Sequence, residues 1–450
     1  MRVAVVGAGP AALAAAYTLS VSGAEVHVYE AAPQVGGLTR SFSLWNETVD
    51  LGPHIFSGYT PRALALWQDI VGSKHRWLPR DTRIAIGDHS YRYPLQPAEL
   101  LRTLGARGTT RALLSLGAAQ LQRTDPNPSA EQFFVARFGR YLYELFFRPY
   151  CEKLWGLDPR EVDVAFCEAL VGDITILGTL WNKLRGQLSR REATLSPVFP
   201  YAHEGAGAFC ERAAALVRLR GGRVELNQPV TRLAYERLRV TGLVVGERRT
   251  HYDWVIASMP LPQLVRALDI VDESVHHALR RLRFRSTILV YLRVKGRGVL
   301  PHLWIYANDR VLAGRVTNFA IWQGRPNALE QTLALEYSCT EGDALWQSED
   351  EALAQLATRE LSALANTTHE VVDAHVRRVR NTHPLYYRGY KHDLDQVTRQ
   401  VERFGRLTVL GRAGSYDYDS QASAIERGIE VAGRVDALGT SLAVARDIHP

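Results

Sequence analysis

Three small residues near the start of the chain, Gly7, Gly9 and Ala12, have the spacing of a loop that binds a dinucleotide. A glycine at position 7 permits a tight turn. A glycine at position 9 lets the backbone approach a pyrophosphate, where the free N–H groups of a helix N-terminus attract anions. Glu30 follows where a carboxylate accepts both hydroxyls of an adenosine ribose, which argues against a 2′-phosphate.

The elements around these residues are those that such a loop requires. Residues 2–6 read as a short buried parallel strand, residues 13–20 as a helix and residues 25–29 as a second buried strand. Strand, turn, helix and strand therefore follow one another in the order of a dinucleotide-binding unit, with an ordinary βαβ unit as the alternative. Pro10 and Ala11, at the predicted start of the helix, complete the residues that we expect at the phosphates.

Beyond Glu30 the chain continues with a double glycine, Gly36-Gly37, followed by Leu38 and Arg40. With this continuation it resembles a group of FAD enzymes that includes monoamine oxidase, protoporphyrinogen oxidase, phytoene desaturase and UDP-galactopyranose mutase. The resemblance implies that Gly37 and Leu38 belong to a loop folded over the pyrophosphate of FAD, which Arg40 would neutralise. A solvated surface arginine is the alternative for Arg40. The resemblance extends from Arg2 to about Val431 and predicts FAD as the cofactor.

A second stretch, Gly52-Pro53-His54, is close to the one that UDP-galactopyranose mutases carry beside the flavin ring. The resemblance places these three residues at the cofactor. It makes His54 the candidate catalytic residue, either as a general base or as a group that orients the substrate by hydrogen bonding. A structural histidine with satisfied hydrogen bonds is the alternative.

Later segments return the chain to the cofactor. The resemblance places Val230 against adenine and Met259 beneath the cofactor. It places a strand–loop–helix near the ribityl phosphate and the flavin edge, with Gly411, Arg412, Gln421 and Ala422 as its cofactor residues. Ala422 departs from the pattern, because the relatives usually carry an aspartate there, and this departure weakens the case for mutase activity.

Residues 138–156 look like a segment with the pattern FFxPYxxKxWG of mutase-like and protoporphyrinogen-oxidase-like flavoproteins. Tyr150 and Trp155 are its candidates for the wall of a substrate cavity. Aromatic side chains at helical spacing are also typical of a hydrophobic core, so both interpretations stay open. Tyr387 and Arg388 are two further, weaker candidates for the cavity.

The order of these segments predicts an α/β protein. A discontinuous Rossmann-type FAD-binding domain is expected from residues 1–75, 196–268 and 386–450, with a helical insertion at 76–195 that caps the substrate. A mainly antiparallel sheet at 269–385 forms the predicted substrate domain. Its strands are predicted at 286–297, 302–309, 313–322, 331–340 and 371–380, and its helix at 350–365.

Composition limits the partners. The 450-residue chain has a net charge of +7, but its 49 arginines and 5 lysines are spread along its length, so binding to nucleic acid is not indicated. An anionic small-molecule substrate, a nucleotide sugar among them, or a weak contact with a membrane surface remains open. No apolar stretch reaches the roughly 18 residues of a membrane-spanning helix. The four scattered cysteines predict buried reduced thiols, no metal site and a cytoplasmic protein, and the oligomeric state is left open.

Three functions are compatible with this sequence. The first is an FAD-dependent oxidoreductase that removes hydride from a sugar-, amine- or porphyrin-like metabolite by transfer to flavin N5. The second is a non-redox sugar-nucleotide mutase resembling UDP-galactopyranose mutase, in which N5 of reduced FAD acts as a nucleophile. The third, a non-catalytic relative such as the Rab GDP-dissociation inhibitors, fits poorly because Gly7, Gly9, Glu30 and Gly37 are all present.

Overall fold

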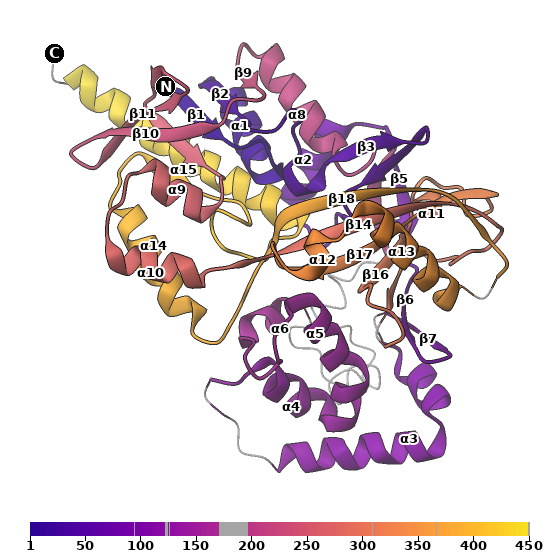
Figure 1. The fold of residues 1–450 in the computed structure, drawn as a ribbon. Helices are drawn as coiled ribbons and strands as arrows, with labels where there is room; N and C mark the ends of the chain where they lie inside the picture. Colours follow the sequence, from indigo (N-terminus) through magenta and orange to yellow (C-terminus); the bar gives the residue numbers. More distant parts are fainter. Residues whose placement is uncertain are drawn as a thin grey trace.

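The computed structural model describes residues 1–93, 95–121, 125, 127–170, 197–307, 309–365 and 367–448. The described elements form a parallel sheet flanked by helices, a larger mixed sheet and a separate group of helices (Figure 1). In the view of Figure 1 that group, α3 to α6, lies at the end of the molecule opposite the N-terminus.

The parallel sheet has five strands in the order β19-β13-β1-β2-β9. They are β1 (Arg2–Val6), β2 (Glu25–Tyr29), β9 (Arg223–Glu225), β13 (Trp254–Ala257) and β19 (Leu407–Val409). Helices α1 (Pro10–Val21), α8 (Ala208–Leu219) and α15 (Gln421–Ile448) belong to the same part of the molecule, and α1 packs against both of the others. Three distant parts of the chain thus build one sheet, which confirms the discontinuous Rossmann-type fold.

The larger sheet has seven strands in the order β18-β14-β17-β16-β15-β6-β7. They are β6 (Thr82–Ile86), β7 (His89–Arg92), β14 (Phe284–Lys295), β15 (Trp304–Ala307), β16 (Arg315–Asn318), β17 (Glu330–Cys339) and β18 (Glu370–Pro384). All neighbours are antiparallel except β15 and β6, which run parallel. The expectation of a mainly antiparallel sheet is confirmed.

The hairpin β6–β7 lies within residues 76–195, the range assigned to the insertion, and extends the sheet through the pairing of Trp304–Ala307 with residues 82–85. One strand of the sheet differs from expectation. The strand predicted at 313–322 ends at Asn318, because the Asn318 side chain accepts a hydrogen bond from the amide of Ala320 at 3.1 Å and starts helix α11 (Phe319–Trp322). The boundaries of the three predicted domains remain predictions.

The separate group of helices comprises α3 (Pro97–Gln120), α4 (Ala130–Leu142), the π-helical turn η2 (Tyr143–Phe147), α5 (Arg148–Trp155) and α6 (Val164–Leu170). Ser129 and Gln132 form a capping box at the start of α4. The described residues between 97 and 170 are therefore mainly helical. Residues 171–195 of the predicted insertion lie outside the described residues.

Shorter elements complete the fold. They are η1 (Gly37–Thr39), β3 (Ser41–Leu44), β4 (Glu47–Asp50), α2 (Pro61–Val71), β5 (His75–Pro79), β8 (Val198–Ala202), β10 (Val230–Glu236), β11 (Arg239–Val245), β12 (Arg248–His251), α9 (Leu261–Ala267), α10 (Glu273–Arg281), α12 (Ala344–Gln347), α13 (Asp350–Leu364) and α14 (Tyr390–Glu402). All four cysteines are buried and free, as predicted. Among the described residues, no helix is long and apolar enough to cross a membrane, and no group of side chains suits a metal ion.

Candidate cofactor and substrate site

A cavity of about 530 Å³ opens at the carboxyl ends of strands β1, β2, β13 and β19. This edge of a parallel sheet is where folds of this kind bind their ligands. The cavity brings together all but four of the predicted cofactor residues: Gly7, Gly9, Pro10, Ala11, Ala12, Glu30, Gly37, Leu38, Arg40, Val230, Met259, Gly411, Arg412 and Gln421. Its volume lies within the range of about 300–1,000 Å³ that is usual for ligand sites.

The glycine turn leaves room for a ligand at the start of α1. Gly7 has a φ of +99° and donates its amide to the carbonyl of Tyr29 at 2.7 Å, which fixes the turn between β1 and α1 against the end of β2. Gly9 is the N-cap of α1, and a Cβ placed on it would meet no protein atom within 4 Å. The space beside this helix N-terminus is therefore open and lined by backbone, as a pyrophosphate requires, and FAD fits the residues present.

Glu30 is fixed at the end of β2 by the backbone. Its Oε2 accepts a hydrogen bond from the amide of Ala8 at 2.7 Å, and its Oε1 accepts one from the amide of Ala32 at 2.8 Å. The amide of Gln228 donates to the carbonyl of Glu30 at 2.9 Å and brings the loop before Val230 to the same edge. Each carboxylate oxygen keeps a second lone pair for hydroxyl donors such as those of a ribose.

Arg40 contributes a positive charge to the lining of this cavity, beside the double-glycine loop. Its Nε donates to the carbonyl of Gly37 at 2.9 Å, so that the side chain lies against the double-glycine loop. Burial lowers the pKa of Arg40, and the charge of Glu30 partly opposes that shift. The partial burial argues against the alternative of a solvated surface arginine.

Arg412 and Asp419 line the other side of the cavity. Nη1 of Arg412 donates to the carbonyl of Thr382 at 3.0 Å, and Nη2 donates to the carbonyl of Asp419. The Asp419 residue is 5% exposed, its Oδ2 has no hydrogen-bond partner, and burial raises its pKa. Sequence reasoning missed Asp419, although it is an acid three residues before the position where the relatives carry one.

Four predicted cofactor residues, Gly52, Pro53, His54 and Ala422, do not line this cavity. Ala422 is 1% exposed and packs in the core beneath the first turn of α15, so an aspartate there would be buried among apolar side chains. Gly52 lies beside Glu336, whose Oε2 would be 3.4 Å from a Cβ at that position. Gly52 therefore lies next to Glu336, a residue that lines a second, inner cavity.

The inner cavity has a volume of about 60 Å³ and an aromatic wall. Its lining comprises Tyr150, Lys153, Leu154, Thr287, Tyr306, Gly314, Arg315, Glu336, Ser338, His383 and Tyr418. Arg315 and Glu336 form a two-pronged ion pair, with Nε to Oε1 at 2.8 Å and Nη2 to Oε2 at 2.7 Å. Of these residues only Tyr150 was predicted. Six of the others, Thr287, Tyr306, Arg315, Glu336, Ser338 and His383, come from strands β14 to β18, whose pairing the sequence does not reveal.

Two histidines beside the inner cavity have lowered pKa values. Burial, followed by the charge of Arg412, lowers the pKa of His54 to about 4, and Nε2 of His54 lies 3.0 Å from the carbonyl oxygen of Leu51. Burial and Arg412 also hold the pKa of His383 well below its usual range. Both imidazoles are therefore neutral at physiological pH.

The remaining substrate candidates lie outside both cavities. Trp155 is 1% exposed and packs edge-on against Phe166 at 4.5 Å, so its ring belongs to the core. Tyr387 donates a hydrogen bond to Asp393 at the start of α14. Arg388 donates to the carbonyl of Asn127 at 2.9 Å.

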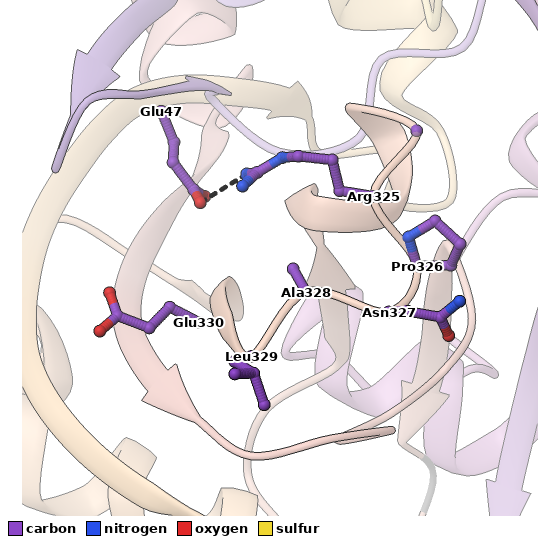
Figure 2. A pocket seen from close by; sticks show the side chains of 8 residues that line it. Glu47, Arg325, Pro326, Asn327, Ala328, Leu329 and Glu330 are labelled. Carbon is purple, nitrogen blue, oxygen red and sulfur yellow. Dashed lines mark hydrogen bonds and ion pairs between the residues drawn. The ribbon is translucent and has the colours of Figure 1, made fainter.

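A further hollow of about 630 Å³ lies on the surface between Glu47 and residues 324–330. Figure 2 shows the Arg325 side chain reaching across it to Glu47, at 2.5 Å. The second oxygen of Glu47 accepts a hydrogen bond from Thr332 at 2.7 Å. Its carboxylate is thus satisfied by structural contacts, and none of the predicted site residues lines this hollow.

The parallel sheet, the open helix N-terminus and the fixed acid at the end of β2 define a dinucleotide-binding protein with a second cavity beside the first. Residues 11–436 match the model of the flavin containing amine oxidoreductases, and the chain belongs to that family. Its cofactor is FAD, as predicted.

Known proteins are similar to this chain in fold. The structure of reduced UDP-galactopyranose mutase has a TM-score of 0.81 at 19% identity, covering 97% of this chain and 96% of the other. Wild-type putrescine oxidase bound to putrescine has a TM-score of 0.67 at 16% identity, covering 97% and 99%. A hydroxysqualene dehydroxylase of Sinorhizobium fredii is 51% identical over 53 residues, which are 11% of this chain and only 13% of that relative.

Proposed function

We propose that this protein is an FAD-dependent oxidoreductase that dehydrogenates a small-molecule metabolite. The main support is the adjacency of the two cavities: Arg412 lines the outer one and lies over the ring of Tyr418, which lines the inner one. When bound, FAD supplies the acceptor for the hydride that the substrate loses. The chain binds both molecules, orients them and excludes water.

The outer cavity has the groups that the cofactor needs. The amides at the start of α1 and the guanidinium of Arg40 oppose the charge of a pyrophosphate. Glu30, held by two backbone amides, accepts ribose hydroxyls. Asp419 has an oxygen without a partner at the same cavity and is our candidate acceptor for a further hydroxyl of the cofactor.

The inner cavity has groups that orient a substrate by hydrogen bonding. His383 lines it and His54 lies beside it; both are neutral at physiological pH, and their lowered pKa values make them weak bases, so their role is to form hydrogen bonds rather than to take up a proton. Lys153 is not a candidate base, because its ammonium donates to the carbonyls of Ala307, Val311 and Ala313 at 2.5, 2.5 and 3.2 Å. It ties helix α5 to the loop before β16.

Substrate addition to the FAD-loaded protein under anaerobic conditions, before and after photoreduction, tests this proposal. Amines, porphyrinogens, and UDP- and TDP-hexoses would be added in turn to the oxidised protein, and bleaching of the flavin absorbance would be followed. The same compounds would then be added to the photoreduced protein. An oxidoreductase bleaches with its substrate and then consumes oxygen or another acceptor in equal amount. A protein that binds FAD but exchanges pyranose and furanose forms only after photoreduction, without consuming an acceptor, would overturn the proposal.

The second candidate function is a non-redox sugar-nucleotide mutase. It is favoured by the similarity in fold to reduced UDP-galactopyranose mutase over 97% of this chain. The buried Ala422 disfavours it, because the relatives usually carry an aspartate at this position. The stoichiometry of acceptor consumption in the same experiment distinguishes the two functions.

A further inference from the structure

Strand β18 contains a β-bulge at the place where it reaches the two cavities. In its pairing with β14, the residues on either side of Ser286 lie opposite Val379 and His383. The three residues of β18 between them, at positions 380–382, therefore face Ser286 alone. Bulges of this kind redirect side chains and are frequent next to functional sites.

The bulge divides the residues of β18 between the two cavities. Residues 378–381 line the outer cavity, whereas His383 lines the inner one. The carbonyl of Thr382, which lies between these two groups in the chain, accepts a hydrogen bond from Nη1 of Arg412 at 3.0 Å. Asn381 is therefore the residue of the outer cavity that immediately precedes the change from one cavity to the other.

Asn381 has a backbone conformation that most side chains avoid. Its φ is +54°, in the left-handed region, where asparagine is one of the few residues other than glycine that occur often. Its backbone amide donates to Oγ of Ser286 at 3.3 Å, which holds this conformation in place. Conformations of this kind persist where the surrounding contacts enforce them, and they cluster at ligand sites.

The side chain of Asn381 is the polar group that β18 leaves open to a ligand in the outer cavity. Of the other three β18 residues there, one is a valine and two are arginines that form ion pairs. Arg378 donates to the carboxylate of Asp350, and Arg380 pairs with Glu341 at 3.3 Å. The side-chain amide of Asn381 forms no hydrogen bond with any residue that the structure describes, so both its donor and its acceptor remain for a ligand.

The outer cavity has two ends, and Asn381 lies at the one that receives the reacting part of the cofactor. Glu30, the acceptor for ribose hydroxyls, follows β2, whereas Arg412 follows β19, and two strands of the parallel sheet lie between them. Arg412 contacts Thr382 and lies over the ring of Tyr418 in the inner cavity. Hydride transfer requires the flavin ring and the substrate to touch, so the isoalloxazine belongs at the Arg412 end.

We infer that the side-chain amide of Asn381 hydrogen-bonds the isoalloxazine of bound FAD and contributes to its reduction potential. This inference rests on the proposed function, which places the substrate in the inner cavity. An amide both donates and accepts, and the polar edge of the isoalloxazine offers N–H and C=O groups to match. The bulge in β18 thereby directs Asn381 to the cofactor and His383, two residues later, to the substrate.

Two substitutions of Asn381 test this inference, and neither measurement needs a substrate. Asn381→Gly removes the amide and is compatible with the positive φ, so the variant should fold and bind FAD roughly fivefold more weakly or worse, the effect of one hydrogen bond. Asn381→Asp keeps the shape of the side chain but adds a negative charge, which opposes the electron-rich reduced flavin. The midpoint potential of bound FAD should then fall by about 30 mV or more, a tenfold change in the relative affinity for reduced and oxidised FAD.

Asn46 provides the matched control, because it has a φ of +61° but lies exposed in the turn between β3 and β4, outside the lining of the outer cavity. Asn46→Gly and Asn46→Asp should keep the Kd for FAD and the potential of wild type.

The inference is overturned if Asn381→Gly binds FAD as tightly as wild type, or if Asn381→Asp folds and keeps the wild-type potential. Thermal unfolding of each apoprotein shows whether the variant is folded, and if Asn381→Asp is not, the Kd of Asn381→Gly decides. A wild type that binds FAD but is bleached by no substrate contradicts the proposed function, whereas unchanged binding and potential in folded Asn381 variants contradict only the role of Asn381.

Discussion

The guanidinium carbon of Arg412 lies 5.0 Å from the centroid of the Tyr418 ring, and these two side chains line different cavities. The imidazole of His383 stacks on the same phenol ring, with centroids 5.6 Å apart. One cation thus acts on both cavities, because its charge also lowers the pKa of His54 and of His383.

Replacement of Arg412 should therefore affect two properties at once. In Arg412→Met we expect the pKa of His54 to rise from about 4, since a nearby positive charge is removed, and FAD to bind more weakly. Titration of the histidine side chains by NMR and titration of the apoprotein with FAD measure the two effects. Arg412→Lys is the matched control and should keep the pKa of His54 low. An unchanged pKa in Arg412→Met would show that burial alone sets it.

Gly9 and Gly7 should respond differently to the same substitution. Gly9 has an ordinary φ of −79° and open space around a Cβ, so Gly9→Ala should leave the stability of the apoprotein within about 0.5 kcal/mol of wild type. The new methyl group enters the cavity, and we expect the Kd for FAD to rise roughly tenfold or more, about 1.4 kcal/mol. Apoprotein unfolding and FAD titration measure both effects.

Gly7→Ala is the counterpart. A Cβ there would lie 2.3 Å from Oγ of Ser258, and the φ of +99° is one that side chains rarely adopt. We expect this variant to lose about 1–3 kcal/mol of stability before any FAD is added. Equal destabilisation by both substitutions would contradict the assignment of Gly9 to the ligand cavity.

The sequence predicted most reliably what a few neighbouring residues determine. The turn at Gly7 and Gly9, and the acid at the end of the next strand, follow from local backbone chemistry, and the structure brings these residues to one cavity. The pairing of Arg315 with Glu336 could not be predicted, because it depends on the register of β16 and β17. The direction of the Trp155 side chain could not be predicted either. It depends on how α5 packs against its neighbours, here Phe166, and not on the spacing of aromatic residues along the helix.

The acid of the C-terminal loop illustrates a smaller error of the same kind. Sequence comparison drew attention to Ala422, where an acid is missing, whereas the chain presents Asp419 at the cavity three residues earlier. Position 422 is already within the first turn of α15 and faces the core. The residue at which the helix begins decides which side chain lines the cavity, and helix boundaries are the least certain part of a prediction from one sequence.

Asp419→Asn tests the role of this acid. Since Oδ2 of Asp419 has no partner in the chain, we expect the substitution to weaken FAD binding by about tenfold, the effect of one lost charge-assisted hydrogen bond of about 1.4 kcal/mol. Titration of the apoprotein followed by flavin fluorescence measures the change. Asp417→Asn is the control, because Asp417 also pairs with Arg427 but does not line the cavity. Equal losses in both variants would assign the effect to Arg427.

Asp50 should make the protein less stable as the pH rises. This fully buried carboxyl accepts hydrogen bonds from Ser41 at 2.5 Å, Tyr201 at 2.8 Å and the amide of Ala206 at 3.1 Å. Burial nevertheless raises its pKa from 3.8 to about 6. The folded state then binds the proton more tightly than the unfolded state, so the contribution of Asp50 to stability is present below pH 4 and is lost between about pH 4 and pH 6.

The loss is of the order of 3 kcal/mol, from a shift of about two pKa units at 1.36 kcal/mol each. Asp50→Asn removes the titrating group, and we expect the unfolding free energy, measured with urea between pH 4 and pH 7, to lose this part of its pH dependence. Asp88→Asn is the control, because Asp88 is exposed and should leave the slope in this range as in wild type. If Asp50→Asn kept the wild-type slope, the buried network around Ser41 and Tyr201 would hold Asp50 ionised throughout, and its hydrogen bonds would outweigh the cost of burial.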